Sequence, residues 1–141
     1  MVLLRRNEVY YILEVVRGRF PFDALKRKVI EVKHRYGSST LLIEDSPISR
    51  GLIQSLREQS INVTCYKPDT DKRARVIAQI DLFAGGSVRF PRHAGWLEEF
   101  TAELLAFPGR HDDQVDALTQ GLAWGRNRRG EVSTSVVGGM F

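Results

Sequence analysis

Hydrophobic and polar residues in the first third of the chain predict a hairpin followed by a helix. Residues 2–4 and 8–16 are rich in apolar and aromatic side chains, which favours two strands around a turn at residues 5–7. Apolar residues then recur at spacings of three and four, as on one face of a helix that ends at Gly37. The apolar positions of this helix are Phe22, Leu25, Val29, Val32 and Tyr36.

The rest of the pattern predicts alternating strands and helices. Residues 40–43 form a continuous apolar run, typical of a strand buried on both faces of a sheet. A helix over about residues 49–59 and a strand over about 61–65 follow. Helices over about 71–83, 96–105 and 112–125 are then expected, with a short strand at 87–90. This order predicts an α/β domain with crossover connections.

The hydrophobic pattern disappears after Gly125. Residues 126–141 are rich in Arg, Gly and Ser, a composition that gives little apolar surface to bury. We therefore predict a domain over residues 1–125 and a flexible tail over residues 126–141.

Composition places the chain among ordinary globular proteins. With 141 residues, 43% of them hydrophobic and 27% charged, it has the size and balance of one domain. No apolar run approaches the roughly 20 residues that span a bilayer, so we expect a cytoplasmic protein without a membrane partner. The only cysteine, Cys65, excludes an intramolecular disulfide, and its apolar neighbours predict a buried thiol. The formal charge of +4 favours a polyanionic partner only weakly.

Three carboxylates stand at the start of the last predicted helix, at Asp112, Asp113 and Asp116. At these spacings at least two of them share a helix face and repel each other unless a cation lies between them. Magnesium and manganese prefer carboxylate and water oxygens, so the cluster favours a divalent-metal site. Helix capping is the alternative, because the N-terminal end of the helix dipole also stabilises acidic residues.

A second acidic pair, Glu44 and Asp45, ends the apolar strand at residues 40–43. Ligands of α/β sheets bind at the carboxyl ends of strands, although a surface turn would also explain the pair. A carboxylate here can meet one on a helix packed over the sheet. Together the two groups would supply the oxygen-rich site of two-metal phosphodiester cleavage.

Basic residues surround the predicted start of the helix near residue 71, where unpaired backbone N–H groups add to their charge. We expect them to bind DNA phosphates, with a solvated helix face as the alternative. These residues are Lys67, Lys72, Arg73 and Arg75. The chain contains no G-x-x-x-x-G-K-[ST] motif, so it should not hydrolyse ATP itself. Its histidines have no zinc-ligand spacing.

The order of these features resembles the C-terminal nuclease domain of phage and prophage large terminase subunits. The resemblance covers about residues 1–125. It is carried by Leu41-Leu42-Ile43-Glu44-Asp45, Lys67-Pro68 with Asp71-Lys72-Arg73-Ala74, Gly86-Ser87-Val88-Arg89-Phe90-Pro91, Trp96-Leu97-Glu98-Glu99-Phe100, Glu103-Leu104-Leu105-Ala106-Phe107-Pro108 and His111-Asp112-Asp113-Gln114-Val115-Asp116-Ala117-Leu118. The last two motifs are the most specific.

The resemblance implies a ribonuclease-H-like mixed sheet flanked by helices. It also implies cleavage of concatemeric double-stranded DNA with magnesium or manganese, two ions in the complete site. Glu44 and Asp113 would be catalytic acids, with Asp45 a weaker candidate than Glu44, and Asp112 and Asp116 would help to bind the metal. The implied partners are duplex DNA, a terminase ATPase domain, the small terminase subunit and the portal protein, in the cytoplasm of the host cell.

The family's first catalytic acid lies on a central strand for which this chain has no matching segment. We therefore expect two unpaired strand edges inside the sheet. The chain could close the gap by sliding its strands together, could borrow a strand from a second copy, or would remain only marginally folded. Without that acid the chain alone should cut DNA poorly. Two alternatives remain: a Holliday-junction-resolvase-like nuclease, and a noncatalytic module that binds DNA or the portal.

Overall fold

The computed structural model describes residues 1–37, 39–128 and 133–138. The strands are β1 (Val2–Arg6), β2 (Val9–Glu14), β3 (Thr40–Glu44), β4 (Val63–Tyr66), β5 (Val88–Arg89) and β6 (Ser133–Gly138). The helices are α1 (Phe22–Arg35), α2 (Arg50–Glu58), α3 (Lys72–Ile77), α4 (Ile80–Ala84), α5 (Leu97–Leu105) and α6 (Asp113–Arg126). Among these residues no helix is long and apolar enough to cross a membrane.

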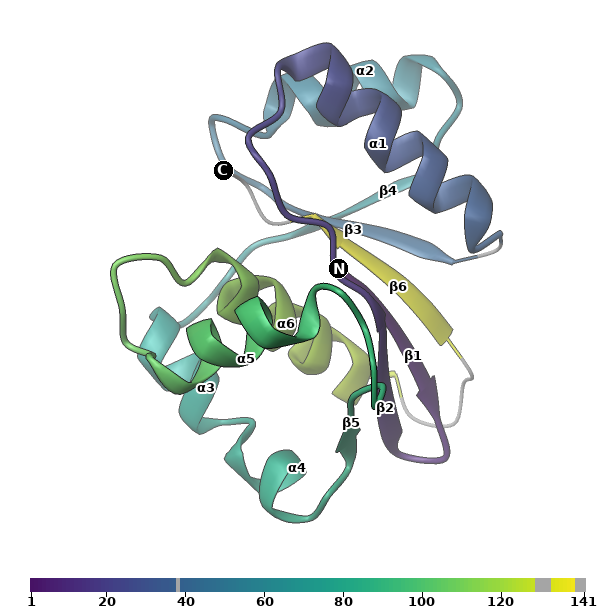
Figure 1. Ribbon diagram of the computed structural model, residues 1–141. Coiled ribbons are helices and arrows are strands. Elements are labelled where there is room, and N and C mark those ends of the chain that lie inside the picture. The colour runs from purple at the N-terminus through teal and green to yellow at the C-terminus, as the bar shows by residue number, and fades with distance from the viewer. Residues whose placement is uncertain (38, 129–132, 139–141) are drawn as a thin grey trace.

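The strands form one mixed sheet in the order β4-β3-β6-β1-β2-β5 (Figure 1). The hairpin β1–β2 is antiparallel and turns through Asn7 and Glu8, both with positive φ. The pairs β3–β4 and β2–β5 are parallel, which requires the crossover connections that the sequence predicts. The α/β prediction is confirmed.

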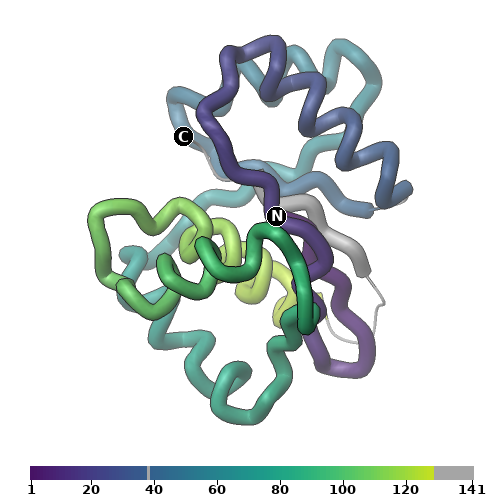
Figure 2. The backbone as a smooth tube through the Cα atoms, in the orientation of Figure 1, coloured from purple at the N-terminus to yellow at the C-terminus, as the bar shows by residue number. Residues whose placement is uncertain are grey.

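Helices cover both faces of the sheet, and each face has its own core. Figures 1 and 2 show α1 and α2 above the sheet and α3 to α6 below it. Leu41 and Ile43 pack in the cluster with Val32 of α1 and Leu56 of α2. Leu42, between them in sequence, points to the opposite face and packs in the cluster with Leu118 of α6 and other residues. The apolar run at residues 40–43 therefore belongs to a strand buried on both faces, as predicted.

The predicted single helix over residues 71–83 is wrong, because the chain forms two helices that separate at Ala78 and Gln79. The guanidinium of Arg126, at the end of α6, donates to the carbonyl of Ala78 at 2.8 Å and to Gln79 Oε1 at 3.3 Å. It also pairs with Asp81 at 3.0 Å. A long-range partner thus satisfies a carbonyl that a continuous helix would have bonded internally.

The prediction of a flexible tail from residue 126 is wrong for residues 133–138, which form β6. This strand lies between β1 and β3, antiparallel to the first and parallel to the second. It fills the position that the resemblance assigns to the missing central strand. Neither sliding of the strands nor a second copy is needed, because the chain's own C-terminal segment pairs with both edges.

Cys65 is exposed, so the prediction of a buried thiol is wrong. It lies on β4, the edge strand of the sheet next to β3, and its neighbour there is Arg57 of α2. The Arg57 guanidinium lies 3.3 Å from its sulfur.

Candidate active site

Glu44 is the last residue of β3, and it faces α6. Side chains alternate along a strand, so Glu44 shares a face with Leu42, whose side chain belongs to the core beneath α6. Gln120 of α6 donates an amide hydrogen bond to the Glu44 carboxylate. Gln120 is almost fully buried at 1% exposure, so this contact fixes the acid against the helix.

The first turn of α6 is capped by a residue from another helix. Glu103 of α5 accepts hydrogen bonds from the backbone N–H groups of Gln114 at 2.7 Å and Val115 at 3.3 Å. Asp112 stands at the N-cap position, but its side chain accepts no capping hydrogen bond. Capping therefore does not explain the acids at the start of α6, and their contacts lie elsewhere.

Asp112 and Asp116 share one cation, the ammonium of Lys72 at the start of α3. Lys72 Nζ lies 2.6 Å from an oxygen of Asp112 and 2.6 Å from an oxygen of Asp116. The guanidinium of Arg75, one turn further along α3, pairs with the other oxygen of Asp116 at 2.7 Å and donates to the carbonyl of Thr70 at 2.6 Å. Two bases and two acids thus join α3 to α6.

The same contacts keep Lys72 charged. Burial alone would lower the pKa of Lys72, but its hydrogen bonds to Asp112 and Asp116 outweigh burial and raise the pKa above its ordinary value. The side chain therefore stays positively charged between the two carboxylates.

Tyr66 lies next to Glu44 in the sheet, on the neighbouring strand β4. It ends β4 and is in register with Glu44 on β3. Burial raises the pKa of the Tyr66 hydroxyl, Arg75 lowers it, and Asp69 and Glu44 raise it, so the ring lies within the electrostatic reach of both groups. We call the set Glu44, Gln120, Asp112, Asp116, Lys72 and Arg75 the carboxylate cluster.

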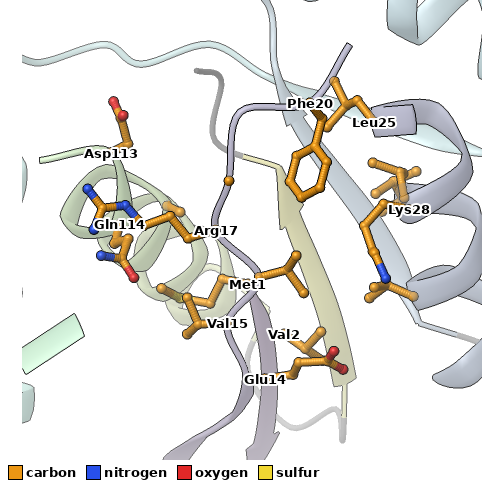
Figure 3. Close-up of a pocket in the computed structure, with 16 residues that line it drawn as sticks. Met1, Val2, Glu14, Val15, Arg17, Phe20, Leu25, Lys28, Asp113 and Gln114 are labelled. Carbon is orange, nitrogen blue, oxygen red and sulfur yellow. The ribbon is translucent and has the colours of Figure 1, made fainter. Parts of the chain in front are cut away.

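Asp113 and Asp45 lie outside the carboxylate cluster. Asp113 is exposed and lines a cavity together with Met1, Arg17 and other residues, and Figure 3 shows its carboxylate pointing away from them. Among the described residues the Asp113 side chain has no hydrogen-bond or ion-pair partner. Asp45 is also exposed, 3.6 Å from Arg50 on the other side of the sheet. The structure therefore brings Glu44, Asp112 and Asp116 to one face of α6 and leaves the other two acids apart.

The donor chemistry of the cluster suits a hard divalent ion, since two carboxylates already converge on one cation. Gln120 Oε1 is buried and has no hydrogen-bond partner among the described residues, so it is a further oxygen that can accept a hydrogen bond or bind an ion. Within the described part of the chain, however, no three His, Cys, Asp or Glu side chains lie close enough to hold a metal as they stand. Glu44 instead accepts a hydrogen bond from Gln120, and the Lys72 ammonium lies between Asp112 and Asp116.

The predicted DNA-binding bases fall into two groups. Lys67 and Arg73 are exposed, as a phosphate contact requires. Arg75 is 7% exposed and already bonded to Asp116 and Thr70, which makes it a structural partner of an acid rather than a free phosphate ligand. Lys72 is half-buried between its two aspartates.

Sequence reasoning missed Glu103 and Gln120 as positioning residues. Glu103 follows Phe100 by three residues, so it falls on the apolar face of α5, and a charge there signals a buried partner. Gln120 follows Asp116 by four residues, which places both on one face of α6.

Comparison with known proteins identifies the family of this chain. A family model described as the terminase RNaseH-like domain matches residues 1–123. Searches of the curated proteins and of the solved structures found no significant match. The matched segment contains the hairpin, β3 with Glu44, and the acids of α6. The chain therefore belongs to the terminase RNaseH-like domain family, whose members are nuclease-type modules.

Proposed function

We propose that this chain is the nuclease domain of a large terminase subunit that hydrolyses double-stranded DNA during phage DNA packaging. The observation that supports it is that Glu44, at a strand end, contacts Gln120 of α6, the helix whose first turn carries the Lys72-bridged pair Asp112 and Asp116. These acids come from segments about seventy residues apart, and the helix cap does not use them.

Bound magnesium or manganese would supply positive charge to activate water and to stabilise the leaving oxygen. Asp112, Asp116 and Glu44 would hold the ions through carboxylate oxygens. Gln120 keeps Glu44 directed at α6, and Arg75 fixes the orientation of Asp116. The exposed bases Lys67 and Arg73 would bind the phosphate backbone without reading sequence.

The test is titration calorimetry with manganese on the wild type and on Glu44→Gln, Asp116→Asn and Asp113→Asn. We expect Glu44→Gln and Asp116→Asn to weaken binding at least about tenfold, because each removes a negative oxygen from the cluster. The family resemblance assigns a catalytic acid to Asp113 and predicts the largest loss for Asp113→Asn. The order of the three affinities decides between the two placements.

Nicking of plasmid DNA in manganese provides the activity measurement. Variants that lose manganese binding should also lose nicking while retaining the far-ultraviolet circular dichroism spectrum of the folded wild type. Unchanged manganese isotherms in all three variants would rule out the acids as ligands.

A noncatalytic DNA- or portal-binding module is the second candidate. It is favoured by β6, which lies where the family's first acid should be and whose sequence Ser-Thr-Ser-Val-Val-Gly has no carboxylate. This candidate predicts salt-dependent binding of unrelated DNA duplexes without nicking, measurable by fluorescence anisotropy.

A further inference from the structure

Lys72 lies where a cation of the carboxylate cluster would be expected. Its ammonium is 2.6 Å from one oxygen each of Asp112 and Asp116, two residues that belong to the same turn of α6. Without a positive charge between them these carboxylates would repel each other. The ammonium is thus a built-in counter-ion of the pair.

Arg75 and Lys72 differ in how firmly they are held. The Arg75 side chain is 8% exposed, and it also donates to the carbonyl of Thr70. The Lys72 side chain is 35% exposed, and among the described residues its ion pairs are with the two carboxylates alone. A long, flexible side chain near solvent can swing away at little cost, whereas a buried guanidinium cannot. Lys72 is therefore the exchangeable cation of the two.

Buried polar atoms beside the pair are left without partners. Within the described residues Arg75 Nε and Gln120 Oε1 have no hydrogen-bond partner, although both residues are more than nine-tenths buried. Buried donors and acceptors are normally satisfied, so these two atoms point to a water or ligand oxygen that completes the cluster. The unpaired oxygen of Gln120 belongs to the same amide that holds Glu44.

We propose that Lys72 closes the carboxylate cluster in the metal-free protein and that a divalent ion displaces it. This inference rests on the proposed function, because it concerns the same acids. Displacement moves one positive charge outward as another enters, so the ammonium becomes free to bind a DNA phosphate only when the metal is present. Metal loading and backbone binding are thereby coupled through one side chain.

Manganese titration of the full chain and of Lys72→Met tests the exchange. Methionine keeps the length and apolar stem of lysine but removes the competing charge. We expect Lys72→Met to bind manganese about three- to tenfold more tightly than the wild type. Lys26→Met is the matched control, because it makes the same change of charge on α1, on the opposite face of the sheet, and should leave the affinity unchanged.

Melting curves give a second readout. Without metal, Lys72→Met should melt below the wild type because its aspartates repel, and manganese should raise its melting temperature by more than it raises that of the wild type. Equal or weaker manganese affinity in Lys72→Met would overturn the exchange while leaving the metal site intact. Absence of manganese binding in all three proteins would overturn the proposed metal-dependent function, and the exchange with it.

Discussion

Glu103 determines how α6 begins, although it belongs to α5. Its buried carboxylate accepts hydrogen bonds from two backbone N–H groups of α6. It also accepts one from the side-chain amide of Gln114, with Nε2 at 2.5 Å from Oε2 of Glu103. A negative charge at this position interacts favourably with the positive end of the helix dipole. The cap thereby holds the turn that carries Asp112 and Asp116.

We predict that Glu103→Gln lowers the free energy of unfolding by about 2 kcal/mol, because an amide replaces one acceptor oxygen with a donor that faces N–H groups. Urea denaturation of wild type and variant measures the loss. Glu98→Gln, exposed on the same helix, is the control and should change stability by less than about 0.5 kcal/mol. Equal losses in the two variants would contradict the capping role.

Residue patterns identify the acids at the strand end and at the helix start as candidates, but not which of them lie on the same side of α6. Glu44 and Asp116 could be selected because a carboxylate at a strand end or in a helix turn is visible locally. The separation of Asp113 from Asp116 depends on the rotation of α6 about its axis. That rotation is fixed by packing and by the contacts of Lys72 and Arg75, none of which is local in sequence.

At the scale of elements, α6 approaches the sheet closely at Gly125. A Cβ atom added at this position would lie 2.7 Å from Cε1 of Tyr10 on β2. The Tyr10 ring is 2% exposed and cannot move away without disturbing the core beneath it. The absence of a side chain at residue 125 therefore sets the distance between helix and sheet.

Gly125→Ala should lower the free energy of unfolding by about 1–3 kcal/mol through overpacking. Helix propensity alone would predict the opposite sign, a gain of about 1 kcal/mol. Gly51→Ala in α2 is the comparison, because a Cβ atom added there would lie at an ordinary van der Waals distance of 3.9 Å from Cε2 of Phe22. Thermal melting should therefore show a lowered midpoint for Gly125→Ala and an equal or raised midpoint for Gly51→Ala. A raised midpoint in both variants would show that the Tyr10 ring can move aside to make room for the added methyl group.

Most elements were predictable because their signals are local. The apolar spacing of α1 and the continuous run of β3 reflect faces that each element buries. The break between α3 and α4 was not predictable, since it depends on Arg126 reaching back to Ala78. The same holds for β6, whose short sequence becomes a strand because two unpaired edges are available to it.

For the whole molecule, β6 is the strand that joins the two halves of the sheet. Val136 is in register with Val2 on one side and with Leu41 on the other. Removing β6 would separate the hairpin β1–β2 from the parallel pair β3–β4. The integrity of the whole sheet thus depends on a strand from the far end of the chain.

Val136→Pro should destabilise the protein by about 2–4 kcal/mol, because proline removes a ladder N–H in the middle of a sheet. Hydrogen exchange should then accelerate at the amides of β1 and β3. Val136→Ala keeps the backbone N–H and should leave much more of this protection in place. Unchanged exchange in β1 and β3 of the proline variant would mean that β6 does not hold the centre of the sheet.

The position of β6 also governs how the protein can be made. A ribosome delivers β1 and β3 before β6, the strand that lies between them in the sheet. At about 5–20 residues per second, several seconds separate the appearance of Glu44 from that of Ser133. During this interval two strand edges are open to pairing with neighbouring nascent chains. Folding of the sheet is therefore completed only after β6 has been synthesised, and yield in a cell should depend on chaperones that shield those edges until then.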